Sequence, residues 1–327
     1  RFDWRAEDGV QWIERADLRT ATTSVRLAGR IERDRRVAVD VDLASSDLAV
    51  ADDLGLRVRR ALGNADAQPL AVGGAGTFRG RWIGTLSEPV YEGRFRGDDV
   101  RYLGVAWGQA EWAGTTSARE VRSHSLVLRK DAAELWLDGR LETGLTGEQD
   151  GVDLGVRLRE WPAADLVQAL GWDLDVSGPV SGRARVEGRR SAPIGEVALT
   201  ARSARYARLP LRDLELVARL RGELTEVTTG RARVGVGRVG FRGTVDAEGV
   251  YDASVDAEDV ELSELFPERV PQKRWGGRVS GRVVMQGVPG RPRLDGRLAS
   301  TRLFLGDEGV GALEALFHAD GDGRVAI

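Results

Sequence analysis

The stretch "GPVSGRARVEG" (residues 178–188) holds the two signals that decide the fold. It opens with a pair of framing glycines, and it continues with Ala184 and Val186 alternating with charged residues. Because successive side chains of a strand point to opposite faces, this alternation predicts a strand with one apolar and one charged face. The same alternation recurs in "LELVARL" (214–220) and "YDASVDA" (251–257). The sequence therefore predicts an antiparallel sheet that is apolar on one side.

The glycine-framed opening recurs along the chain at spacings of 102 and 99 residues, as "GTFRG" (76–80), "GPVSG" (178–182) and "GRVSG" (277–281). A proline follows each opening glycine by 13 to 15 positions, and a strand-like stretch follows each proline; the prolines are Pro89, Pro193 and Pro292. Self-similarity at a fixed period is the signature of a repeat architecture. We therefore expect a partial repeat at 1–72, whole repeats at 73–175 and 176–275, and the start of a further repeat at 276–327.

Short helix-like segments fall near the end of the repeats, at 50–63, 162–172 and 261–266. They are too short and too few to cover five or six strands per repeat. The predicted fold class is therefore all-β: an elongated, curled antiparallel sheet, shaped as an open β-groove, built from repeats of about 100 residues with short helices at the joints.

One stretch, "RARVGVGRVGFRG" (231–243), contains a literal G-x-G-x-x-G at Gly235, Gly237 and Gly240. A dinucleotide site needs a strand before this motif and a helix that begins on its last glycine. Here the apolar positions change from even to odd numbers between Val234 and Val239, as they do across a tight turn, and a strand follows. We interpret the glycines as a hairpin turn.

Composition argues against several classes of function. The 48 basic and 51 acidic residues nearly balance, so no patch for nucleic acid is indicated. The chain has no cysteine, which excludes disulfides and thiolate metal sites. Nowhere does it hold the roughly 18 consecutive apolar residues that a membrane-spanning helix needs. The chain starts at Arg1 and stops within a repeat, so we expect a piece of a longer protein.

Residues for catalysis are scarce. The two histidines are His124, which we place on the polar face of a strand, and His318, for which no role is indicated. The acid-rich stretch 256–264 alternates with apolar residues and lacks the spacing of a calcium loop. We expect no enzyme activity, no catalytic residue, no metal and no cofactor.

With this repeat, the sequence resembles the AsmA-like/TamB family of envelope proteins, whose β-groove modules are similar to those of bridge-like lipid transfer proteins. The resemblance rests on three features: the "GxVSGR" openings at 178 and 277, the proline-containing segments at Pro193 and Pro292, and "FRGTV" at 241–245. It implies a trough that shields phospholipid acyl chains between the inner and outer membranes. It also implies a periplasmic location, an inner-membrane anchor outside this segment, and an outer-membrane barrel protein as a partner of other regions.

The alternation of each strand identifies the side chains expected to line the trough. They are apolar residues at inward positions of the two whole repeats: Leu135, Leu137, Leu141, Val180, Ala184, Val186, Val197, Leu199, Leu214, Leu216, Leu220, Val234, Val239, Phe241, Val245 and Val255. Most inward positions are Val, Leu or Ala, and we expect few large aromatic side chains among them. This composition favours a lined trough over a packed core.

Two other functions remain open. The chain could be a structural spacer or a scaffold for assembling outer-membrane proteins, with its own side chains filling the sheet and without conducting lipid. A carbohydrate-acting β-solenoid enzyme would need two or three carboxylates on one exposed shelf, and no acid recurs outside the alternating face.

Overall fold

The computed structural model describes residues 2–61, 67–142, 150–265, 275–288, 291–320 and 325–326. The protein is all-β and antiparallel, as the sequence predicts. It divides into two compact units: unit 1 is Arg1–Leu158 with Gln168–Trp172, and unit 2 is Arg159–Val167 with Asp173–Ile327. Strand β10 (Gly151–Pro162) and helix α2 (Ala163–Ala169) contribute residues to both units. The predicted repeat boundaries do not follow this division, and they remain predictions.

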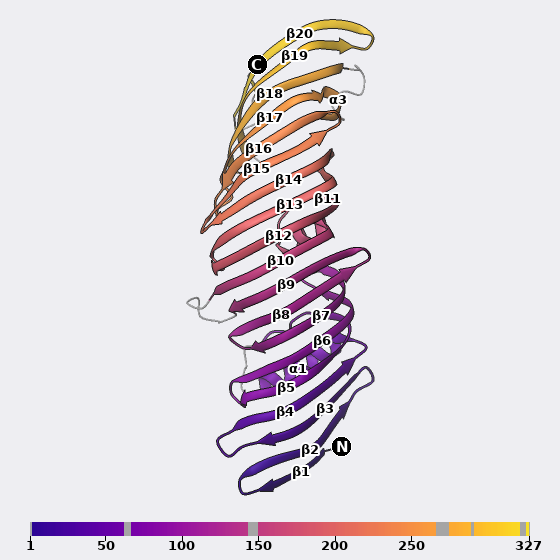
Figure 1. Cartoon of the computed structure of the whole chain (residues 1–327), viewed down its shortest axis with the longest axis vertical. Coiled ribbons are helices and arrows are strands. Elements are labelled where there is room, and N and C mark those ends of the chain that lie inside the picture. Colours follow the sequence, from indigo (N-terminus) through magenta and orange to yellow (C-terminus); the bar gives the residue numbers. More distant parts are fainter. Residues whose placement is uncertain are drawn as a thin grey trace. The chain divides into compact units, whose positions relative to one another are not determined.

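Unit 1 is a meander in which each strand pairs with the next along the chain (Figure 1). Its elements are β1 (Phe2–Glu7), β2 (Val10–Arg19), β3 (Thr23–Ile31), β4 (Arg36–Ser45), α1 (Leu48–Ala61), β5 (Gly73–Thr85), β6 (Pro89–Tyr102), β7 (Val105–Ser117), β8 (Glu120–Lys130), β9 (Ala133–Glu142) and the first part of β10.

Unit 2 is a second meander of the same kind. Its elements are β11 (Val176–Ser177), β12 (Pro179–Arg189), β13 (Ala192–Tyr206), β14 (Leu209–Arg221), β15 (Leu224–Val234), β16 (Gly237–Val245), β17 (Tyr251–Glu261), α3 (Leu262–Leu265), β18 (Trp275–Val288), β19 (Arg291–Leu305), β20 (Glu308–Ala319) and β21 (Val325–Ala326). The three helices begin and end within a few residues of the predicted segments, and they stand where the sequence predicts joints.

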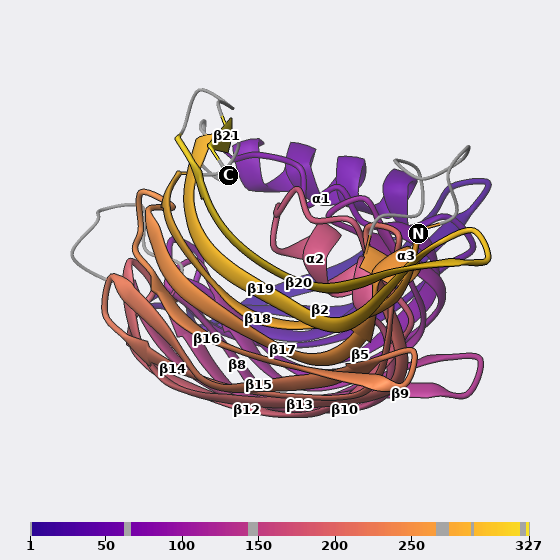
Figure 2. The same cartoon turned by 90° about the horizontal axis from the view of Figure 1, so that it is seen from above.

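Within each unit the strands are bent, so that the sheet has a concave and a convex side (Figure 2). Helix α1 lies on the concave side of unit 1 (Figure 2). In unit 2, α3 contacts β17 and β18 and begins two residues after Val260, which is fully buried on the apolar face. A Cβ on Gly235, next to the fully buried Val234, would lie 3.6 Å from the carboxylate of Glu264 in α3. The apolar face is therefore the concave one, and we call it the inner face. In the parts of the chain that the structure describes, no strand pairing closes either unit into a barrel.

The convex face carries the charged residues of the alternation. Many of its ion pairs join neighbouring strands, as in Arg81–Asp40 (3.1 Å) of unit 1 and Arg282–Asp256 (3.7 Å) of unit 2. Cross-strand pairs of opposite charge stabilise a sheet modestly and keep its outer face hydrated.

The repeated "GxVSG" opening has a structural role in unit 2. Gly178 and Gly277 have φ angles of 108° and 118°, which L side chains rarely adopt. Three residues later, the hydroxyls of Ser181 and Ser280 accept hydrogen bonds from the backbone N–H of Glu160 (2.9 Å) and Asp259 (3.0 Å).

Both acceptors serve a bulge, because Glu160 and Asp259 are non-glycine residues with positive φ (51° and 52°). Each bulge shifts the alternation by one residue and turns the next side chain, Trp161 or Val260, into a fully buried position. The motif therefore fixes how one strand ends and the next begins.

The corresponding opening in unit 1 differs from the frame that the sequence suggests. The glycine with positive φ is Gly74 (104°) rather than Gly76, and a Cβ on it would lie 2.7 Å from the carbonyl oxygen of Asp98. A Cβ on Gly178 would meet the carbonyl oxygen of Ser203 in the same way, at 2.6 Å. The spacing of Gly74 to Gly178 equals that of Pro89 to Pro193, so the true frame is displaced by two residues.

The G-x-G-x-x-G stretch is a hairpin, as predicted. Gly235 (φ 58°) and Val236 form the turn between β15 and β16, where Val234 pairs with Gly237. Gly240 lies within β16, and no helix begins there.

Candidate functional site

The inner face of unit 2 consists of rows of side chains that run across the strands. In its middle row, each residue is the ladder partner of the next. The row is Gly182, Leu199, Leu216, Gly230, Phe241, Val255, Val283, Gly296 and Phe317. Nine strands therefore contribute to one uninterrupted apolar row.

Unit 1 has an equivalent row, and three adjacent members of it are aromatic. Its ladder partners are Leu18, Val25, Leu43, Phe78, Phe95, Trp112, Leu126 and Leu137. A second aromatic pair, Trp82 and Tyr91, has ring centroids 6.1 Å apart. The expectation of few large aromatic side chains is therefore wrong for unit 1, because these five aromatic residues lie on its inner face.

The predicted lining residues of unit 2 lie where the alternation places them. Ladder pairs join Ala184 to Val197, Leu199 to Leu216, and Phe241 to Val255, all on the inner face. The remaining members lie on the inner face of β12, β14, β15 and β16: Val180, Val186, Leu214, Leu220, Val234, Val239 and Val245. Leu135, Leu137 and Leu141 lie on the inner face of unit 1, on β9, and are ladder partners of Leu128, Leu126 and Val121. Their role as a lining remains a prediction.

Most inner-face side chains are only half-buried. Some inner-face residues are fully buried, such as Val39 and Val234, whereas side chains of the middle rows such as Leu199, Leu216 and Phe95 keep part of their surface accessible. Within the described ranges, the elements outside the strands that could cover them are three helices of 14, 7 and 4 residues. The inner face therefore lacks the second layer that normally buries an apolar sheet surface.

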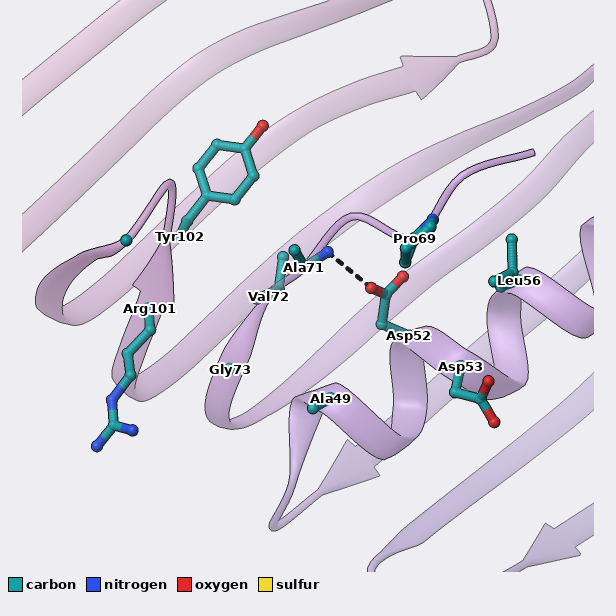
Figure 3. Close-up of a pocket in the computed structure, with 11 residues that line it drawn as sticks. Ala49, Asp52, Asp53, Leu56, Pro69, Ala71, Val72, Gly73, Arg101 and Tyr102 are labelled. Atoms are coloured by element: carbon teal, nitrogen blue, oxygen red, sulfur yellow. Dashed lines mark hydrogen bonds between the residues drawn. The ribbon is translucent and has the colours of Figure 1, made fainter. Parts of the chain in front are cut away.

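A pocket of about 540 Å³ lies at the edge of the inner face of unit 1, between α1 and the segment that leads into β5 (Figure 3). Asp52 of α1 accepts a hydrogen bond from the backbone N–H of Ala71 (2.8 Å), which ties the helix to this segment. Arg101 also lines the pocket, but its side chain points away from Asp52 and Asp53 (Figure 3). The pocket thus brings no opposite charges together on a ligand-sized site.

The structure places both histidines on the polar face. His124 is exposed, and Nδ1 of His318 lies 2.7 Å from Oδ1 of its ladder partner Asp295. Among the residues that the structure describes, no group of three metal-ligating side chains occurs, and no helix is long and apolar enough to span a bilayer.

Within the part of the chain that the structure describes, two carboxyl groups have clearly shifted pKa values, and both shifts are downward. Burial would raise the pKa of Asp17, but the hydrogen bond from Arg15 (2.5 Å) and the charges of Arg15 and Arg26 outweigh it and lower the pKa. The backbone N–H and guanidinium of Arg36 lower the pKa of Asp34. A general acid needs a raised pKa, so neither group is suited to that role.

Comparison of the chain with protein-family models, with curated proteins and with solved structures found no match. Function must therefore be argued from the inner face itself.

Proposed function

We propose that this chain is a segment of a lipid-conducting bridge of the bacterial envelope. Its inner face would shield the acyl chains of phospholipids as they pass between the inner and outer membranes. The single observation that supports the proposal is the uninterrupted apolar row across each unit, half-buried and without a covering layer. An apolar sheet surface of this extent needs an occupant, and acyl chains match its chemistry.

The energetics favour many weak contacts. Complete burial of one CH₂ group contributes about 0.8 kcal/mol, and an open trough buries only part of each group. An acyl chain meets a similar apolar surface at each successive strand, so no position binds it much more tightly than the neighbouring one. Such a surface suits lateral movement better than tight capture.

The experiment is native mass spectrometry of the protein purified without detergent. The proposal predicts co-purified phospholipid on the wild-type chain and its loss in Leu216→Glu, because a carboxylate in the middle row cannot remain hydrated beneath an acyl chain.

The matched control is Val217→Glu, which adds the same charge one residue away on the polar face. It should keep the lipid. Wild-type protein without lipid, or equal loss in both variants while circular dichroism shows an intact sheet, would contradict the proposal. A lipid-free wild type would instead support a structural spacer or assembly scaffold.

A further inference from the structure

The inner faces contain many glycines, and large side chains lie on them. In unit 2, Phe241 is the ladder partner of Gly230, and its ring occupies the space that a Cβ on Gly230 would take. The same holds for Phe317 and Gly296. These rings therefore lie along the sheet instead of standing away from it.

Leucines of unit 2 follow the same rule. A Cβ on Gly182 would lie 2.9 Å from Cδ2 of Leu199, and one on Gly281 would lie 2.7 Å from Cδ2 of Leu298. Each leucine is the ladder partner of its glycine.

Unit 1 uses the same device with aromatic rings. Phe78 leans on the paired glycines Gly80 and Gly93, where added Cβ atoms would lie 2.8 and 2.7 Å from its Cζ. Phe95 leans likewise on Gly76 and Gly97, and Trp112 leans on Gly114 at 2.9 Å. Two units with different side chains therefore share one arrangement, which we call the glycine seat.

Side chains that lie along the sheet leave a deeper groove on its inner face. When side chains of two facing sheets stand upright and interdigitate, they fill a space about 10 Å thick. A ring that lies flat on a glycine occupies little of that space, and it presents its face to the concave side. Covering of a strand glycine by a neighbouring aromatic ring also protects the backbone there.

We propose that the glycine seats keep the inner face open, and that acyl chains lie on the flattened side chains. This inference rests on the proposed function and names the residues that determine the depth of the groove. A side chain at a seat would force the large neighbour to stand up, and it would then occupy the path of the cargo. The glycines of the seats therefore determine which cargo fits the groove, because they set its depth without contributing a side chain of their own.

The test uses Gly230→Ala, with Gly240→Ala as the matched control. Gly240 lies in the neighbouring strand on the outer face, and a Cβ there would meet only the carbonyl oxygen of Gly230, at 3.9 Å. Co-purified phospholipid, measured by native mass spectrometry against the wild type, should fall at least fivefold in Gly230→Ala and should not change in Gly240→Ala.

The second variant is the double substitution Gly230→Ala with Phe241→Ala, which removes the displaced ring. Recovery of bound lipid to within about twofold of the wild type would support the glycine seat. Wild-type lipid content in folded Gly230→Ala, or no recovery in a folded double variant when Phe241→Ala alone binds normally, would overturn it.

The pair Gly296→Ala and Phe317→Ala repeats the experiment elsewhere in unit 2, and it decides the question if Gly230→Ala does not fold. A wild-type protein without lipid would instead contradict the proposed function, so the two failures are distinguishable.

Discussion

Units 1 and 2 have the same architecture but different inner faces. The middle row of unit 1 has three adjacent aromatic residues, Phe78, Phe95 and Trp112. That of unit 2 has two leucines, two valines and three glycines, with separate aromatic rings at Phe241 and Phe317. Low aromatic content is thus not what leaves the face uncovered. In both units the large side chains lie against glycines, and this arrangement is the feature common to the two.

The first prediction compares a fully buried tryptophan of unit 2 with a half-buried tryptophan in the middle row of unit 1. Trp161 of unit 2 is fully buried, whereas Trp112 of unit 1 is half-buried. Trp161→Ala should lower the free energy of unfolding of its unit by about 3–5 kcal/mol, and Trp112→Ala by clearly less. Urea denaturation monitored by circular dichroism measures both. Equal losses would mean that Trp112 is packed as in a closed core.

The second prediction tests whether the two units share one frame. Gly74 of unit 1 and Gly178 of unit 2 have positive φ, and each approaches a carbonyl oxygen of the next strand. Replacement of either by alanine should cost about 1–3 kcal/mol, because the backbone conformation is unfavourable for an L residue and the Cβ has no room. The matched control is Gly73→Ala, because a Cβ on Gly73 would lie 3.6 Å from the nearest atom, Cβ of Arg101, and its φ is not in the left-handed region. Gly73→Ala should cost less than about 1 kcal/mol, and a loss equal to that of Gly74→Ala would argue against the displaced frame.

The third prediction concerns the serine that supports each bulge. Ser181→Ala removes the acceptor for the backbone N–H of Glu160 and should destabilise unit 2 by about 1–2 kcal/mol. The residue at the corresponding place in unit 1 is Thr77, which is exposed. Thr77→Ala should therefore change the free energy of unfolding by less than about 0.5 kcal/mol. Differential scanning calorimetry of the two variants measures this difference. Equal losses of stability would argue against it.

The smallest effect is expected on the outer faces, where the units should behave alike. Arg81→Gln in unit 1 and Arg231→Gln in unit 2 each remove a cross-strand ion pair, with Asp40 and with Glu215. Because these side chains are exposed, each loss should be below about 1 kcal/mol and should shrink further in high salt. A large, salt-independent loss in either variant would mean that its outer face is covered.

Much of the fold could be predicted from local sequence. Period-two alternation identifies the strands. The change of parity between Val234 and Val239 correctly predicts a hairpin, although the sequence there matches a phosphate-binding motif. The three helix segments were also recognised from the sequence, to within a few residues of their ends. These features depend on residues that are close together in the chain.

The features that the sequence analysis missed depend on pairing between strands. The bulges at Glu160 and Asp259 depend on positive φ angles, and an acidic residue in the sequence does not predict such an angle. The glycine seats require the ladder register, although one local signal exists: glycine and phenylalanine two residues apart, as in Phe78 and Gly80, share a face. The repeat of this spacing could have indicated the aromatic inner face of unit 1.

Photo-crosslinking tests the central claim most directly. A benzophenone side chain would be placed at Leu199 on the inner face and, as the matched control, at Thr200 on the outer face, in protein that carries its native lipid. The account predicts phospholipid adducts at position 199 and none at position 200. Equal labelling at the two positions, or no adduct at position 199 on a folded protein, would contradict it.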